Sequence, residues 1–130
     1  MIRSRLTLPV ALAATALAAL PALAHHGWAW TEDEESRLAG TIEAMSLGNP
    51  HAYFDIAADD GVWRVDLAPP SATARSGLVE GVAAVGDTAS FTGHRSRDPQ
   101  ERVFKAETVT VNGETYDVYP RREKTLTPGA

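Results

Sequence analysis

The stretch VWRVDLAPPSATARSGL, residues 62–78, decides the fold that we expect for this chain. Apolar and charged side chains alternate over residues 63–67, which is the period-two pattern of a strand buried on one face. The pair Pro69-Pro70 ends this strand, since neither proline can donate a hydrogen bond to a sheet. A different element must therefore begin here, in the middle of the chain.

We expect that element to be a short helix over residues 71–76, with Ser71 as its N-cap and Gly77 as its C-terminal stop. On both sides of it the period-two pattern returns. An Asp-Gly pair at residues 60–61 and an Asn-Gly pair at residues 112–113 are signals for tight hairpin turns. The other strands are predicted from Leu38 up to the turn at 48–50 and over residues 51–57, 88–94, 103–111 and 114–119.

The predicted strand at 103–111 changes the parity of its apolar residues between Ala106 and Val109. Such a change indicates a β-bulge, which inserts one extra residue into the strand. Three strands, a short helix and two further strands follow the order of the OB-fold, a small closed barrel. We therefore predict an all-β, OB-fold-like barrel of five to six strands over residues 38–119, with one short helix between strands three and four. An immunoglobulin-like sandwich is the alternative, but it needs about seven strands and no central helix.

The N-terminus has the three parts of a secretory signal peptide. Positive charge in the first five residues precedes an apolar run over residues 6–20, and residues 22–24 end in Ala-x-Ala. The alternative is a membrane anchor, but the run is shorter than the ~20 residues that span a bilayer. We predict cleavage after Ala24, a periplasmic location and no stable membrane insertion of the mature protein.

Processing would leave a small acidic protein. Without Arg3 and Arg5 the chain keeps 10 basic and 17 acidic side chains, a net charge of −7 with neutral histidines. A protein of this charge is poorly suited to bind a phosphate backbone, so we expect no nucleic-acid partner. The chain has no cysteine, which excludes disulfides, thiolate metal ligands and cysteine nucleophiles.

Five segments together resemble an uncharacterised family of short exported bacterial proteins with a domain of unknown function. They are HHGW (25–28), NPHAYFDI (49–56), VWRVDLAPPSATARSGL (62–78), VGDTASFTGHRSRDP (85–99) and VFKAETVTVNGETYDVY (103–119). The resemblance implies a periplasmic location and a small OB-like barrel. It implies no catalytic residue.

The four histidines, His25, His26, His51 and His94, are the candidate metal ligands. Cleavage after Ala24 would give His25 a free α-amine beside its imidazole, a pair of nitrogens suited to Cu(II). In an OB-fold, the loops that hold His51 and His94 lie at the same rim of the barrel. An N-terminal arm over residues 25–37 could bring the first histidines to that rim.

We therefore predict a periplasmic copper-binding carrier, buffer or sensor, with zinc as the alternative metal and no enzymatic activity. The partner would be a metal ion or a periplasmic protein. A metal-free interaction or small-ligand-binding module is the second reading, with structural histidines and with Tyr53, Trp63 and Arg95 available for contact. Two further expectations concern the termini: the tryptophans of the arm dock it onto the barrel, and residues 120–130 form a disordered tail.

Overall fold

The computed structural model describes residues 26–129. The predicted signal peptide, residues 1–24, and the predicted ligand His25 lie outside the described residues. Within 26–129 no helix has both the length and the apolar character needed to cross a membrane.

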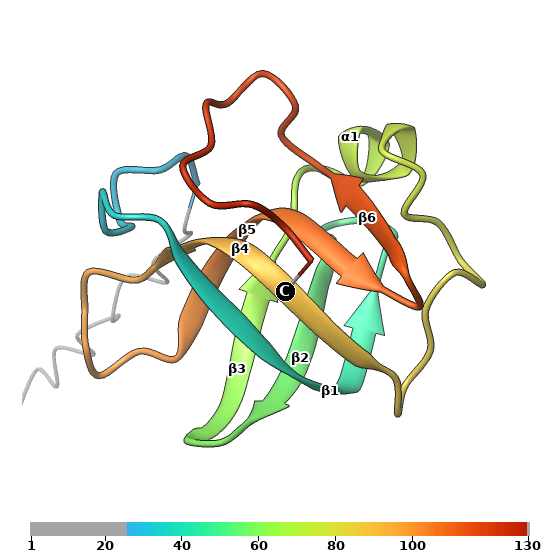
Figure 1. The fold of residues 1–130 in the computed structure, drawn as a ribbon, viewed down its shortest axis with the longest axis horizontal. Coiled ribbons are helices and arrows are strands. Elements are labelled where there is room, and N and C mark those ends of the chain that lie inside the picture. Colours follow the sequence, from blue (N-terminus) through green and yellow to red (C-terminus); the bar gives the residue numbers. More distant parts are fainter. Residues whose placement is uncertain (1–25, 130) are drawn as a thin grey trace, which may run out of the picture.

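The described residues form a closed β-barrel (Figure 1). Neighbouring strands follow the order β3-β2-β1-β4-β5-β6, and a parallel pairing between β3 and β5 closes the first five into a barrel. Strand β6 extends the sheet beyond the closure, and the helix lies between β3 and β4 in sequence. This arrangement confirms the predicted fold class. The elements are β1 (Ser36–Ser46), β2 (Tyr53–Ala58), β3 (Gly61–Asp66), α1 (Pro70–Arg75), β4 (Thr88–Arg95), β5 (Val103–Val111) and β6 (Glu114–Asp117).

Alternate side chains of the strands fill the barrel. Phe54 of β2 and Phe91 of β4 meet at its centre, with ring centroids 5.7 Å apart. Each large apolar side chain buried in this way stabilises the fold by about 1.5–3 kcal/mol. The other large side chains that the strands contribute to this core are Leu38, Ile42, Ile56, Trp63, Val65, Phe104, Val109 and Val111.

Both predicted hairpins are present. Ala58 pairs with Gly61 across the first turn, between β2 and β3. In the second turn, between β5 and β6, Asn112 and Gly113 have φ values of 52° and 78°. Positive φ at both central residues is the reason why an Asn-Gly pair occurs in such a turn.

The helix differs from the prediction at its start. It begins at Pro70, its N-cap is Pro69, and no side chain caps it, so Ser71 is not the N-cap. A proline at the first helical position lacks one of the N–H groups that would have no partner inside the helix, and its φ already suits a helix. At the other end, Gly77 has a φ of 98° and stops the helix as predicted.

The predicted bulge lies at Glu107. On β4, Thr92 pairs with Thr108, whereas the next residue, Gly93, pairs with Ala106. Glu107 is therefore the extra residue of β5. Its side chain is completely buried although it carries a carboxylate, so the bulge places a charge at a covered position on the barrel wall.

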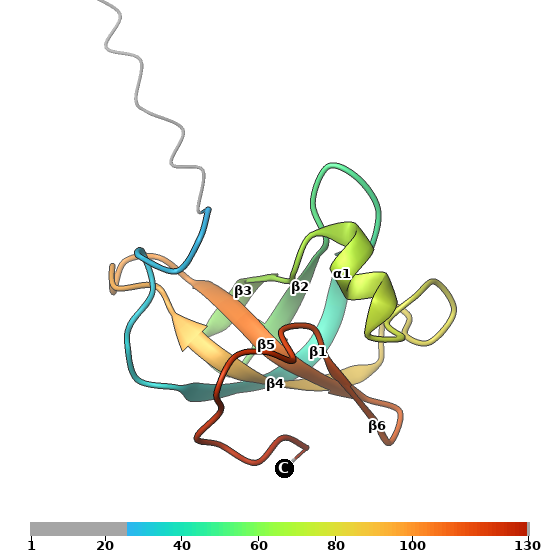
Figure 2. The same ribbon diagram turned by 90° about the horizontal axis from the view of Figure 1, so that it is seen from above.

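The arm lies against the end of β4, and the C-terminal segment runs across the outer side of the sheet (Figures 1 and 2). The arm is joined to the end of β4 by a bridge between Thr31 and Ser96 and by a hydrogen bond from the N–H of Glu32 to the carbonyl of Arg95 (2.8 Å). The arm is thus docked on the barrel, as expected from its tryptophans.

Residues 120–129 lie against the barrel, where we expected a disordered tail. The Lys124 ammonium is 3.0 Å from a carboxylate oxygen of Asp117, and the Arg37 guanidinium donates to the carbonyl of Thr127. Two of the charges that suggested a solvated tail, those of Arg122 and Lys124, instead have acidic partners on the barrel, Glu107 and Asp117.

Candidate functional site

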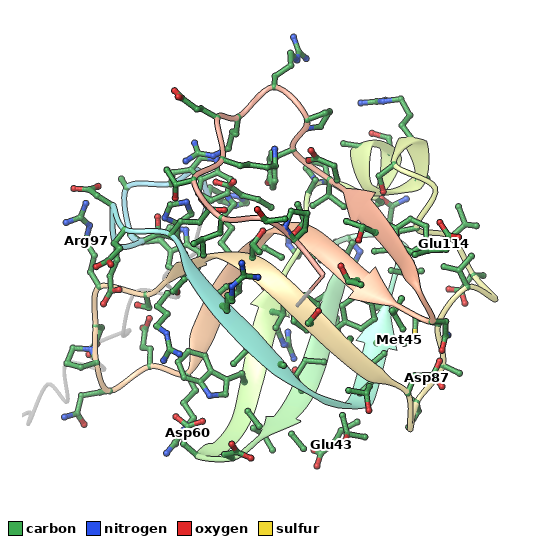
Figure 3. All side chains as sticks on the ribbon, in the orientation of Figure 1. Glu43, Met45, Asp60, Asp87, Arg97 and Glu114 are labelled. Carbon is green, nitrogen blue, oxygen red and sulfur yellow. The ribbon has the colours of Figure 1, made fainter. Side chains whose placement is uncertain are left out.

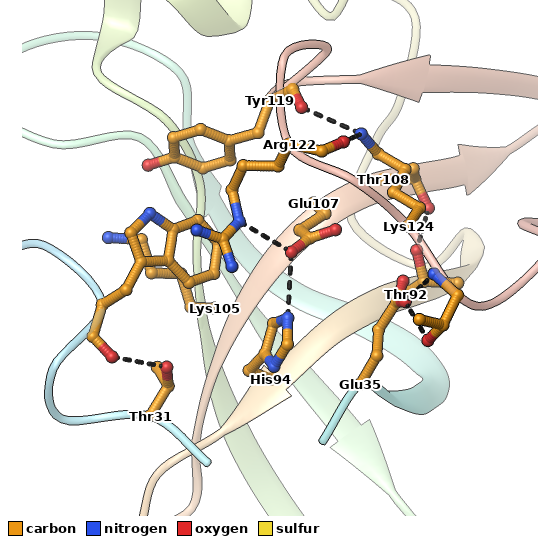
Figure 4. Close-up of polar contacts among 12 residues, drawn as sticks. Thr31, Glu35, Thr92, His94, Lys105, Glu107, Thr108, Tyr119, Arg122 and Lys124 are labelled. Atoms are coloured by element: carbon orange, nitrogen blue, oxygen red, sulfur yellow. Dashed lines mark hydrogen bonds and ion pairs between the residues drawn. The ribbon is translucent and has the colours of Figure 1, made fainter. Parts of the chain in front are cut away.

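A buried cluster of charged side chains lies beneath the two terminal segments, on the outer face of β4 and β5 (Figure 4). Oε1 of Glu107 is 2.9 Å from Nε2 of His94 and accepts a hydrogen bond from Nε of Arg122 (2.9 Å). The other ring nitrogen of His94 donates to the carbonyl oxygen of Glu32 (2.9 Å). A single buried carboxylate therefore joins β4, β5 and the C-terminal segment, and His94 connects it to the arm.

The arm contributes Trp28 to this cluster. Its ring lies edge-on to the rings of His94 and Tyr119, with centroids 5.5 and 4.9 Å away. Two cations lie over its face: Cζ of Arg122 is 3.7 Å and Nζ of Lys105 is 4.6 Å from the ring centroid. A cation over an indole face is attracted by the ring's negative quadrupole, and this attraction grows when the pair is desolvated.

Lys105 is buried on the barrel wall, with 6% of its surface exposed. Its Nζ donates to the carbonyl oxygen of Gly27 (2.6 Å), the residue before Trp28. Burial lowers the pKa of Lys105; the nearby Asp66 carboxylate opposes this shift, and Arg122 adds to it. The lysine thus depends on the arm both for a hydrogen-bond acceptor and for its aromatic contact.

A second contact ties the arm to the C-terminal segment. Oε2 of Glu35 accepts hydrogen bonds from the backbone N–H and the hydroxyl of Thr125 and from the N–H of Leu126. Burial acts to raise the pKa of Glu35, but these hydrogen bonds, with a contribution from His94, lower it overall. The two terminal segments therefore hold each other as well as the barrel.

Two of the described histidines lie close together, and the third has a different environment. His26 of the arm and His51, just before β2, have ring centroids 6.1 Å apart, and both residues are exposed. His94 is 7% exposed, and both of its ring nitrogens already have partners. Among residues 26–129 no group of three or more histidine or carboxylate side chains is arranged to hold a metal ion.

A separate polar pocket of about 430 Å³ lies between the tip of the β2–β3 hairpin and the loop from β4 to β5. Figure 3 shows Asp60 at that tip. Trp63 lines the pocket, donates from Nε1 to Asp60 (2.8 Å) and carries the Arg95 guanidinium over its ring (4.8 Å). The hydrogen bond from Trp63 lowers the pKa of Asp60, and Arg102 and Arg95 act in the same direction. Tyr53 lies outside this pocket, stacked under Arg64 (3.8 Å).

Sequence reasoning missed the residues that hold the terminal segments on the barrel, which are Lys105 and Glu107 of β5 and Arg122 of the C-terminal segment. One signal for them was present, because the parity change in residues 103–111 locates the bulge that carries Glu107. Nothing in the sequence indicated that the lysine and the glutamate are covered, since their cover comes from the two ends of the chain.

The protein is a closed five-stranded OB barrel with an added edge strand. The segments at the two ends of its described chain pack over a buried ionic cluster. The chain belongs to the family of unknown function DUF6152, whose model matches residues 12–104. No curated protein matches the chain. Among solved structures it is similar to the crystal structure of the ZRD-deleted mutant of TiaS in complex with agmatine, at 20% identity and a TM-score of 0.44. That match covers 74% of this chain and 25% of the other, so the chain spans about a quarter of that protein.

Proposed function

We propose that this protein is an exported metal-binding carrier, buffer or sensor, which binds one copper ion through His26, His51 and the mature N-terminal residue His25. The observation that carries the proposal is the 6.1 Å separation of the His26 and His51 rings, which come from segments far apart in the sequence. A ligating histidine nitrogen lies about 2.0–2.1 Å from its metal. Small rotations of two exposed side chains are therefore enough to let both rings share one ion.

The chemistry of the ligands favours copper. Two imidazoles and the α-amine and imidazole of His25 would supply only nitrogen donors, and Cu(II) prefers tetragonal nitrogen coordination. Zinc accepts the same donors, so it remains the competing metal. The acidic net charge of the protein raises the local concentration of cations around the site.

This proposal narrows the predicted ligand set from four histidines to three. A metal ion on His94 would have to displace either the Glu32 carbonyl or the Glu107 carboxylate from a ring nitrogen. Displacing Glu107 would leave a buried carboxylate without one of its partners, which is costly. We therefore assign His94 to the structural cluster and not to the metal.

The proposal requires export and cleavage after Ala24, because the α-amine belongs to His25 only in the processed chain. The test uses protein exported and processed natively, with the N-terminal mass confirmed. Cu(II) and Zn(II) are titrated by calorimetry into the wild type and into His51→Ala, with Glu114→Ala, a change at an exposed position of β6, as the control. One-to-one binding that is lost only in His51→Ala supports the proposal; no binding to the processed wild type overturns it.

The polar pocket supports a second candidate function, the binding of a small organic ligand without any metal ion. Its volume is in the range of small-molecule sites, and it is lined by Trp63 and Arg95. Side chains of both signs line it, so it suits a small ligand that carries both charges. Binding of such a ligand that is lost in Arg95→Gln and kept in His51→Ala would favour this function over metal binding.

A further inference from the structure

We infer that Trp28 is the positioning residue of the proposed metal site, so that docking of the arm and binding of the metal strengthen each other. This inference rests on the proposed function, since it concerns the affinity of that same site. Of the proposed ligands that the structure describes, His26 lies on the arm and His51 lies just before β2 of the barrel. The distance between them is therefore set by whatever holds the arm in place.

The arm is fixed immediately after His26. The carbonyl of Gly27 accepts the hydrogen bond of Lys105, and Trp28 is covered by Arg122 and by the ring of Tyr119. The carbonyl of Trp28 then accepts hydrogen bonds from the backbone N–H (3.1 Å) and hydroxyl (2.7 Å) of Thr31. Only one residue, Gly27, lies between His26 and this anchored indole, so the position of the indole limits where the histidine can lie.

The contacts around Trp28 include terms that favour docking of the arm and a term that opposes it. Arg122 bridges the indole and the buried Glu107 carboxylate, which favours the docked arm. Lys105 contributes a hydrogen bond and a cation–π contact to the docked arm, but the arm also removes water from its ammonium group, and this desolvation offsets part of the gain. The docked state is thus held by a balance of contacts, and a change of a few of them will shift the population of docked arms.

A metal ion shared by His26 and His51 would add a second link between arm and barrel. Since it binds the docked arm with more ligands than the released arm, it must favour docking. By linkage, a change that releases the arm weakens metal binding, and complete release weakens it by the factor by which the metal favours docking. The expected factor is about 5-fold to 150-fold, the usual range of coupling between two sites.

The test compares two neighbouring arginines of the C-terminal segment. Arg122→Gln removes the cation over Trp28 and the partner of Glu107, while Arg121→Gln changes an exposed residue and serves as the matched control. Neither residue is a proposed ligand. Zn(II) affinity is measured by calorimetry on the processed protein, together with Trp28→Leu and with thermal unfolding to verify the barrel. Hydrogen exchange of the Glu32 amide, which bonds to the carbonyl of Arg95, reports docking with and without Zn(II).

We expect Arg122→Gln and Trp28→Leu to weaken Zn(II) binding by at least about 5-fold and to speed exchange of the Glu32 amide, with Arg121→Gln unchanged. Zn(II) should slow that exchange in the wild type and not in His51→Ala. Unchanged Zn(II) affinity in Arg122→Gln and Trp28→Leu overturns the inference and leaves the metal site standing. Absence of metal binding to the wild type overturns the proposed function and this inference together.

Discussion

The Nε2 atom of His94 lies 2.9 Å from Oε1 of Glu107, although the two residues belong to different strands and neither is inside the barrel. Glu107 is the unpaired residue of the bulge in β5, between the partners of Thr92 and Gly93, whereas His94 itself pairs with Lys105. Arg122 closes the group from the C-terminal segment. The contact therefore joins the barrel to the segments that cover it.

Loss of the Glu107 carboxylate should strongly destabilise the protein. Glu107→Ala leaves Arg122 and His94 without their buried partner, and removal of one member of a buried pair costs about 3–5 kcal/mol. Glu107→Gln keeps an acceptor oxygen at the same position and should cost less. The free energy of unfolding from urea titration measures both effects.

The control for Glu107 is Glu114→Ala, a glutamate in the exposed part of β6. An exposed change of this kind is expected to alter the free energy of unfolding by no more than about 0.5 kcal/mol. Equal losses in Glu107→Ala and Glu114→Ala would contradict the importance of the buried cluster.

Glu35 should make stability depend on pH in the acidic range. Its folded pKa lies below the ordinary value of 4.5 because hydrogen bonds from Thr125 and Leu126 outweigh the effect of burial. As the pH falls through this range, the unfolded chain takes up the proton first, so the stabilisation from Glu35 is complete above about pH 4.5 and is lost below the folded pKa. Glu35→Gln should be less stable than the wild type at pH 7.

The measurement for Glu35 is the free energy of unfolding between pH 3 and pH 7 for the wild type and Glu35→Gln. The difference between the two proteins should shrink on acidification. A difference that stays constant over the whole range would show that the contact does not depend on the charge of Glu35.

The barrel wall beside His94 should tolerate no side chain at Gly93. A Cβ atom there would collide with the carbonyl oxygen of Lys105 and lie 2.9 Å from Cα of Ala106, both backbone atoms of the neighbouring strand. We expect Gly93→Ala to destabilise by about 1–3 kcal/mol or more, since the strands must separate. Gly48→Ala is the control, because no atom lies within 4 Å of its built Cβ. A similar melting temperature for both variants would contradict the close approach of β4 and β5.

The sequence predicted the barrel because its signals are local. Alternation in residues 63–67 and the Asn-Gly pair at 112–113 each depend on neighbouring residues only, and both were confirmed. The bulge at Glu107 was predicted for the same reason, from the change of parity within one strand.

The cover of the barrel could not be predicted, because it depends on contacts between the two ends of the chain. Thr125 and Glu35 are 90 residues apart in sequence, yet they share hydrogen bonds. The cluster of charges in the last residues indicated a solvated tail, since nothing nearby in sequence shows a partner. The prediction that Ser71 is the N-cap of the helix was wrong for a local reason, because Pro69 and Pro70 can begin a helix without a capping side chain.

The ring nitrogens of the histidines offer the most direct test of which histidines bind the metal and which belong to the buried cluster. Zn(II) should perturb the ring nitrogens of His26 and His51, since these two rings are exposed and close together. The ring nitrogens of His94 should stay unchanged, because the Glu32 carbonyl and the Glu107 carboxylate already occupy both of them. Long-range ¹⁵N–¹H correlation spectra of the processed protein, recorded with and without one equivalent of Zn(II), separate the three residues. A metal-bound shift on Nε2 of His94 would mean that the ion displaces Glu107. His94 would then be a metal ligand, contrary to its assignment to the buried cluster.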